Sequence, residues 1–427
     1  MQMNIEWKIL MNNFKIPKIR FMNFNDKWNY KTLDEISNSI EYGLNASAKN
    51  FDGIHKYLRI TDIDDSSRLF LTDKLSSPDV NFTEEDYENY KLQKNNLLFA
   101  RTGASVGKTY LYRESDGEVY YAGFLIRARL HDSYDGKFVF QQTLTDKYKR
   151  FIEITSQRSG QPGVNGKEYG EWKIGMTSYP EQSAIGSLFR TLDDLLTSYK
   201  DNLANYQSLK STMLSKMFPK AGKTVPEIRL DGFEGEWENL RLGDCAIIKG
   251  RLGWKSLKQE EYTEVGPSMI AGKHIKNGVI DWGEVDHIPQ WRYDESPEIM
   301  LEKGDIIFSK DGSLGNPALV SNLKGEATIN STMMLVRLDK KVSSQFFYQV
   351  LTSSVFQKLI YLKVSGSSIP HLFQADMQDF RFFAPCIEEQ QAIGSYFSNL
   401  DNLINSYQEK ISQLETLKKK LLQDMFI

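Results

Sequence analysis

The chain contains few of the residues from which metal sites and covalent cross-links are built. Its 427 residues include only two cysteines, Cys245 and Cys386, and five histidines that are scattered without metal-ligand spacing. Two distant cysteines exclude a disulfide framework and a zinc ribbon, and they fit a reducing compartment. No apolar run approaches the ~20 residues of a membrane helix, and the N-terminus lacks the apolar stretch of a signal peptide. We therefore expect a cytoplasmic protein that binds no metal and no membrane.

The sequence also lacks the short motifs of common enzymes. It has no Asp/Asn/Ser-Pro-Pro-aromatic tetrad of amino-methyltransferases, no glycine-rich cofactor loop between a strand and a helix, and no convincing nuclease cluster of acids and lysine. The serine hydrolase, metalloprotease and protein kinase motifs are missing too. The net charge is −3, so the chain has no overall basic surplus of the kind that favours tight DNA binding, although a local basic face stays possible. These absences predict a non-catalytic protein without a cofactor of its own.

The stretch "ARTGASVGKTYLY", Ala100–Tyr112, looks like a phosphate-binding loop of an NTPase. Such a loop has four residues between its two glycines, and it opens a helix whose N-terminus binds the phosphates. Here three residues separate Gly103 from Gly107, and the "TYLYR" that follows is typical of a strand. The segment therefore predicts a hairpin turn. An NTPase is the minor alternative, which a nucleotide-binding assay would test.

An internal repeat dominates the sequence. Glu181–Phe218 and Glu389–Phe426 align without a gap, and 17 of their 38 positions are identical. The preceding regions correspond more weakly: "PKIR" matches "PEIR", and "NNLLFARTG" matches "GDIIFSKDG". The counterpart of the supposed phosphate loop is "SKDGSLGNPALV", in which Asn316–Pro317 replaces the lysine and threonine. A turn that survives in both copies while these residues change argues further against nucleotide binding.

Each repeated segment has the heptad pattern of a long amphipathic helix. The first heptad positions are Ile185, Leu192, Tyr199, Tyr206 and Met213 in one copy, and Ile393, Leu400, Tyr407, Leu414 and Leu421 in the other. A broad apolar stripe over four heptads needs a partner. We expect the two helices to pack on each other as an antiparallel coiled coil; the alternative is that each packs on its own globular part.

The two globular parts read as mixed α/β structure. Short apolar runs that partly alternate and end at glycine or polar turns predict strands, among them "LLFAR", "GFLIRARL", "IIFSK" and "MMLVRL". The stretches "KFVFQQTLTDKYKRFIE" and "SQFFYQVLTSSVFQKLI" look helical in both copies. The fold class expected is therefore α/β (α+β) domains, duplicated and separated by two long helices that form an antiparallel coiled coil.

Taken together, these features resemble the specificity subunits of type I DNA restriction-modification systems over essentially the full length. The resemblance rests on the paired "EQ.AI...F..LD.L" helices, the "(L/I)(L/I)F(A/S)(R/K)xG" strand-turns, and the "SGQPGVN" and "SGSSIPHL" loops. It implies five segments: target-recognition domain 1 (1–180), spacer helix 1 (181–218), a linker (219–225), target-recognition domain 2 (226–385) and spacer helix 2 (386–427). One departure is that Pro180 runs directly into Glu181, whereas the second copy has three residues between Pro385 and Glu389.

The resemblance also implies partners. Each recognition domain would bind one half of a bipartite, non-palindromic double-stranded DNA target, and the helices would dock two methyltransferase subunits. S-adenosylmethionine, ATP and Mg would be bound by these partners and by restriction subunits. A helix from Arg190 to Lys216 measures roughly 40 Å, which suits half-sites about one DNA turn (~34–36 Å) apart. A competing hypothesis is a coiled-coil scaffold protein without a DNA role.

Residues in the glycine turns and loops are the candidate DNA contacts. Arginine and lysine bind guanine or phosphates, whereas asparagine and glutamine recognise adenine. The candidates are Arg101, Lys108, Arg158, Gln161 and Asn165 in the first globular part, and Lys273, His274, Lys310, Ser367 and His371 in the second.

Overall fold

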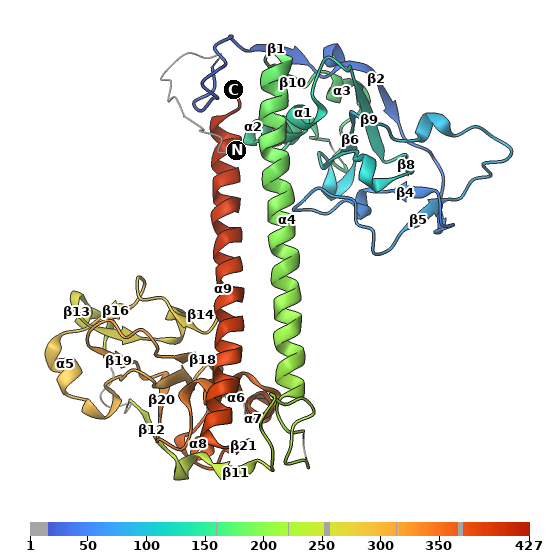
Figure 1. The fold of residues 1–427 in the computed structure, drawn as a ribbon. Helices are drawn as coiled ribbons and strands as arrows, with labels where there is room; N and C mark the ends of the chain where they lie inside the picture. Colours follow the sequence, from blue (N-terminus) through green and yellow to red (C-terminus); the bar gives the residue numbers. More distant parts are fainter. Residues whose placement is uncertain (1–15, 159, 221, 252–256, 313, 366–369) are drawn as a thin grey trace. The chain divides into compact units, whose positions relative to one another are not determined.

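The computed structural model describes residues 16–158, 160–220, 222–251, 257–312, 314–365 and 370–427 (Figure 1). The chain divides into two compact units. Unit 1 consists of Met1–Lys200 and Lys410–Ile427, and unit 2 of Asp201–Glu409. Two long helices, α4 (Tyr179–Lys216) and α9 (Ile387–Asp424), each belong in part to unit 1 and in part to unit 2. Within the described residues, no helix combines the length and the apolar character that a membrane span requires.

The centre of unit 1 is a four-stranded antiparallel sheet in the order β2-β9-β6-β7. Its strands are β2 (Ser37–Tyr42), β9 (Leu125–Leu130), β6 (Asn96–Ala100) and β7 (Thr109–Leu111). Strand β6 is buried over all five residues, "NLLFA", as a continuous apolar run predicts. Shorter strand pairs surround this sheet: β1 (Asn29–Thr32) with β10 (Lys173–Met176), β3 (Ala48–Asn50) with β5 (Ser76–Pro78), and β4 (Lys56–Leu58) parallel to β8 (Val119–Tyr121).

Three short helices complete unit 1: α1 (Gly136–Gln142), α2 (Asp146–Thr155) and α3 (Gly166–Gly170). The helical structure expected over the "KFVFQQTLTDKYKRFIE" stretch is confirmed, and it forms two helices, α1 and α2. Hydroxyl side chains cause the break: Thr143 Oγ1 donates to the Phe140 carbonyl, and Thr145 caps α2 by accepting from the Tyr148 N–H. Such local bonds offer the backbone an alternative to continuing the helix.

Unit 2 repeats this architecture. Its main sheet has the order β12-β20-β17-β18, with β12 (Ala246–Gly250), β20 (Met333–Leu338), β17 (Ile306–Ser309) and β18 (Gly315–Leu319) in the same roles as β2, β9, β6 and β7. The smaller strands are β11 (Glu238–Arg241) with β21 (Arg381–Ala384), β13 (Thr263–Ile270) between β16 (Asp286–His287) and β19 (Ala327–Ile329), and β14 (Ile275–Lys276) with β15 (Val279–Ile280). The helices are α5 (Gln290–Asp294), α6 (Ser344–Thr352), α7 (Ser354–Ser365) and α8 (Gln374–Gln378). Here too the stretch expected to be helical forms two helices, α6 and α7.

An arginine clamp fastens the long helices in each unit. In unit 1, Arg20 donates to both carboxylate oxygens of Glu181 at the start of α4, at 2.6 and 2.7 Å, while the neighbouring Ile19 N–H bonds the Asp424 carbonyl at the end of α9. Both charged side chains of this pair are almost fully buried. The clamp therefore ties the beginning of one helix to the end of the other.

Unit 2 has the same clamp at the matching positions. Arg229 donates to both oxygens of Glu389, which opens α9, and the Ile228 N–H bonds the Lys216 carbonyl at the end of α4. The "PKIR"/"PEIR" and "EQ" matches of the sequence thus mark a structural contact. The fold class expected from the sequence, duplicated α/β domains with two long helices packed together, is confirmed.

Candidate nucleic-acid interface

The glycine turn of unit 1 is a hairpin turn between two strands. Strands β6 and β7 pair in antiparallel register, with Phe99 opposite Thr109, and a single 3-10 turn at Gly103–Ser105 lies between them. No helix follows the lysine, so the phosphates of a nucleotide would meet no helix N-terminus here. The prediction of a strand-turn-strand element is confirmed.

Two loops of unit 1 are joined at this turn. The Val164 N–H bonds the Arg101 carbonyl at 2.9 Å, and the Gly103 N–H bonds the Pro162 carbonyl at 3.0 Å. A β-carbon on Gly103 would lie 3.0 Å from Nε2 of Gln161, and φ of +77° at this glycine suits a residue without a side chain. The candidates Arg101 and Gln161 therefore lie in one surface region.

Aromatic side chains flank Arg101. Its guanidinium lies 5.2 Å from the ring centroid of Tyr42 and 5.9 Å from that of Phe124, and both rings are largely exposed. Cation–π contacts hold a guanidinium in place, and exposed rings beside it offer apolar area to a base or sugar. The candidates chosen from the sequence include neither aromatic residue, because Tyr42 ends β2 and Phe124 precedes β9, both far from Arg101 in the sequence.

Three other candidates of unit 1 already have partners. Lys108 is only 7% exposed, and its ammonium pairs with Asp65 at 2.7 Å. Arg158 is bound by Glu168, and the Asn165 side chain caps α3 by accepting from the Glu168 N–H. For Lys108 to contact DNA, its ion pair with Asp65 would have to break and its ammonium would have to pair with a phosphate instead. Asn165 acts first as a helix cap.

Unit 2 contains the equivalent junction with different side chains. The Leu372 N–H bonds the Lys310 carbonyl at 2.9 Å, as Val164 bonds Arg101 in unit 1. His371 contacts the carboxylate of Asp311 through Nδ1, and the Lys310 ammonium lies 3.8 Å from the same carboxylate. Lys310 and His371 are thus brought together. The candidate Ser367 lies outside the described residues.

The remaining candidates of unit 2 lie on a 3-10 turn at Gly272–His274. A β-carbon on Gly272 would lie 2.5 Å from Ser309 Oγ, so this turn lies against the end of β17, next to Lys310. Lys273 is well exposed and pairs with Asp286. His274 is only 2% exposed, accepts a hydrogen bond from the Ala271 N–H through Nδ1, and has its pKa lowered by burial. A neutral, buried His274 supports the turn from beneath.

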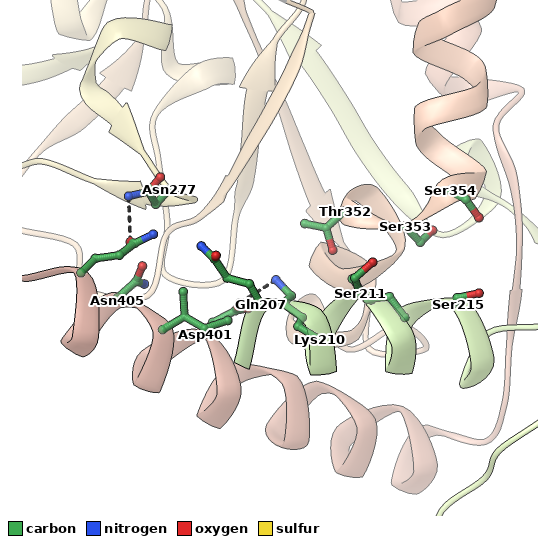
Figure 2. Close-up of a pocket in the computed structure, with 13 residues that line it drawn as sticks. Gln207, Lys210, Ser211, Ser215, Asn277, Thr352, Ser353, Ser354, Asp401 and Asn405 are labelled. Atoms are coloured by element: carbon green, nitrogen blue, oxygen red, sulfur yellow. Dashed lines mark hydrogen bonds and ion pairs between the residues drawn. The ribbon is translucent and has the colours of Figure 1, made fainter. Parts of the chain in front are cut away.

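Unit 2 also contains a pocket away from the glycine turn, against the second part of α4 (Figure 2). It measures about 510 Å³ and is lined by short polar side chains, including Ser211, Ser353 and Asn405, around an ion pair of Lys210 with Asp401 at 2.5 Å. The pair leaves the pocket without net charge. Among the described residues, no group of three or more histidine, cysteine or acidic side chains is placed to hold a metal ion.

Comparison with known proteins gives concordant results. Residues 234–416 match the family model of the type I restriction modification DNA specificity domain. The MjaVIII specificity subunit of a type I restriction enzyme from Methanocaldococcus jannaschii is 21% identical over 88% of this chain and 85% of its own length, and the putative MjaX specificity subunit of the same organism is 23% identical over 96% and 95%. The crystal structure of a type I S subunit from M. genitalium superposes with a TM-score of 0.69 at 18% identity, covering 96% of this chain and 99% of that one. At this identity the last match shows the fold.

Proposed function

We infer that the two globular parts of this chain recognise the two halves of a bipartite, non-palindromic DNA target, because the chain belongs to the DNA specificity subunits of type I restriction-modification systems. A specificity subunit is the non-catalytic member of such a system and carries no cofactor. The proposal goes beyond this family membership in naming which surface of each globular part binds double-stranded DNA.

One observation carries the proposal: the same backbone junction occurs twice with different side chains. In unit 1 it presents Arg101 between two exposed rings. In unit 2 it presents Lys310 and His371 around Asp311. A frame that is repeated while its exposed polar groups change suits two half-sites of different sequence, because hydrogen-bonding side chains distinguish base edges.

The long helices would serve as spacer and docking surface. We propose that they hold the recognition surfaces about one DNA turn apart and dock two methyltransferase subunits, which bind S-adenosylmethionine. Restriction subunits that use ATP and Mg would join the same complex. Inserting one helical turn into both helices should widen the unspecified gap of the target. An unchanged gap would refute the spacer role.

Mapping adenine methylation in the host genome tests the proposal. Deleting the gene should abolish methylation at one bipartite motif. Arg101→Gln should relax or change only one half of that motif, and the matched variant Lys310→Gln only the other half. Unchanged methylation after deletion would favour a scaffold without a DNA role, and changes in the same half for both variants would contradict the assignment of one half-site to each unit.

A further inference from the structure

A narrow cationic cleft lies beside α4 in unit 1, away from the glycine turn. Four basic side chains from four different segments line it: Arg68 from the loop before β5, Arg113 after β7, Lys137 from α1 and Arg190 from α4. The opening measures about 20 Å³. That volume admits one oxygen atom or water, and it excludes a base or a nucleoside.

The carboxylates beside the cleft leave much of this charge uncompensated. Asp193 is held by Lys418 at 2.6 Å and accepts from Gln141 at 3.1 Å. Asp194 receives two bonds from Arg190, at 2.9 and 3.0 Å, and lies 3.7 Å from Arg113. Arg68 and Lys137 form no ion pair within 4 Å with any described residue, although the charges of Asp65 and Asp64 act on Arg68. Among the side chains that line the cleft, four cations accompany one carboxylate, that of Asp193, in a chain whose net charge is −3.

Two of the four cations, Arg68 and Arg113, lie in unfavourable surroundings. Arg68 has φ of +59°, in the left-handed region that arginine rarely adopts. Burial, together with the charge of Arg190, lowers the pKa of Arg113, and burial lowers that of Arg68. Half-buried arginines with reduced pKa and a strained backbone indicate that the cations are retained for a purpose other than stability.

Unit 2 has neutral residues at the equivalent positions. Gln345 replaces Lys137, Ser398 replaces Arg190 and Ser321 replaces Arg113 in the repeat. The turn that corresponds to the Arg68 loop carries Asn277, which also has a positive φ, +52°, and bonds Gln408 on α9 at 2.9 Å (Figure 2). The shared frame thus folds without the four cations, so they are specific to unit 1.

The geometry points to a phosphate-binding site for the DNA backbone, formed by Arg68, Arg113, Lys137 and Arg190. This assignment rests on the proposed function. The loop that carries Arg68 also carries Asp65, which pairs with Lys108 at the glycine turn, so one loop links the cleft to the turn whose surface is assigned to DNA. A phosphate oxygen in the cleft would fix the position of the duplex without recognising its sequence.

Two substitutions that copy unit 2 test the site: Arg68→Asn and Lys137→Gln, combined in the full chain. DNA affinity is measured against salt concentration for the target duplex and for a scrambled duplex. Removing one phosphate contact reduces the slope of log K against log salt by about 0.9. Because the cleft would hold one phosphate, the wild type should lose roughly 3.5-fold more affinity than the double variant between about 50 and 200 mM salt, equally on both duplexes. Lys18→Gln, at an exposed lysine 3.4 Å from Asp424, is the matched control and should keep the wild-type slope.

Several outcomes would contradict the assignment of this cleft as a phosphate-binding site for DNA. An unchanged slope in the double variant refutes phosphate binding to DNA. A loss confined to the target duplex would mean base recognition instead. Reduced co-purification of methyltransferase subunits with an unchanged slope would assign the cleft to an acidic partner surface, and stabilisation by inorganic phosphate with an unchanged slope would assign it to a free anion. If the proposed function itself were wrong, the result would be distinguishable from these, because the wild type would then not prefer its target over the scrambled duplex.

Discussion

The arginine clamps yield the sharpest prediction about stability. We consider Arg20→Met, which removes the cation of the unit 1 clamp and approximately keeps its volume. Glu181 is fully buried and would keep its carboxylate without a cation, although Thr177 still donates to it. An uncompensated buried charge costs about 3–5 kcal/mol. That is a large fraction of the ~5–15 kcal/mol by which most domains are stable.

The double variant Arg20→Met, Glu181→Met separates the charge from the packing. Replacing a buried ion pair by apolar side chains of similar volume is often neutral or stabilising, so the double variant should recover most of the stability that the single variant loses. The mirror variant Arg229→Met should act on unit 2 in the same direction but more weakly. Arg229 is 18% exposed, against 3% for Arg20, so water reaches this clamp.

Hydrogen exchange resolved by peptide is the appropriate assay because it reports each unit separately. Arg20→Met should speed exchange in the buried strands of unit 1, such as β6, and leave β17 of unit 2 unchanged; Arg229→Met should do the reverse. A destabilisation below about 1 kcal/mol in the single variant would refute the reasoning, since it falls well short of the cost of an uncompensated buried charge. So would a double variant that is as unstable as the single one.

Three further predictions concern unit 2. Gly394→Ala should destabilise the packing of α9 on α6 by about 1–3 kcal/mol, because the new β-carbon would lie 2.7 Å from Cβ of Gln345; thermal unfolding measures this, and a gain in stability from alanine's helix propensity would contradict it. Lys210→Asp and Asp401→Lys should each lower the melting temperature, whereas the charge swap should restore it, since the pair at 2.5 Å is only partly exposed; an equally unstable swap would mean that the pair contributes nothing. Unfolded His274 takes up a proton near pH ~6.5, whereas burial lowers its folded pKa. The unfolded state therefore binds more protons below about pH 6.5, and stability should fall as the pH drops from about 7 to 5, by at most ~1.4 kcal/mol per pH unit. Hydrogen exchange of unit 2 measures this, and an unchanged pH dependence in His274→Gln would exclude the imidazole as the cause.

The sequence predicted the fold class because the repeat and the heptads are local patterns. Periodicity identifies the long helices, and the glycine spacing with the following strand identifies the hairpin turn. The sequence did not predict where the helical stretch after β9 would break. That break depends on whether the hydroxyls of Thr143 and Thr145 bond to the backbone, and threonine also occurs inside helices.

The candidate interface was predicted only in part. The turn and loop residues Arg101 and Gln161 lie together, as loop composition suggested. The burial of Lys108 against Asp65 and of His274 beneath its turn depends on contacts between segments far apart in the sequence. A lysine beside a glycine turn has the same sequence pattern whether its ammonium faces solvent or an aspartate. Which of the ten candidates touch DNA stays a prediction.

The two copies of the repeat share some positions and differ at others, and the two kinds of position serve different ends. The residues that match between the copies are those that fasten the helices, such as Glu181 and Glu389 in the clamps and Asp193 and Asp401 in their ion pairs with lysine. Some residues that differ, such as Arg101 and Lys310, lie at the glycine turns, where a ligand could reach them. A matched position in these helices therefore points to a contact within the fold, and a mismatch among the exposed polar groups of the glycine turns is what two different half-sites would require. The four cations of the cleft, which unit 2 replaces by neutral residues, belong with DNA positioning and not with recognition of its sequence, and they lie outside the loops that sequence reasoning selects.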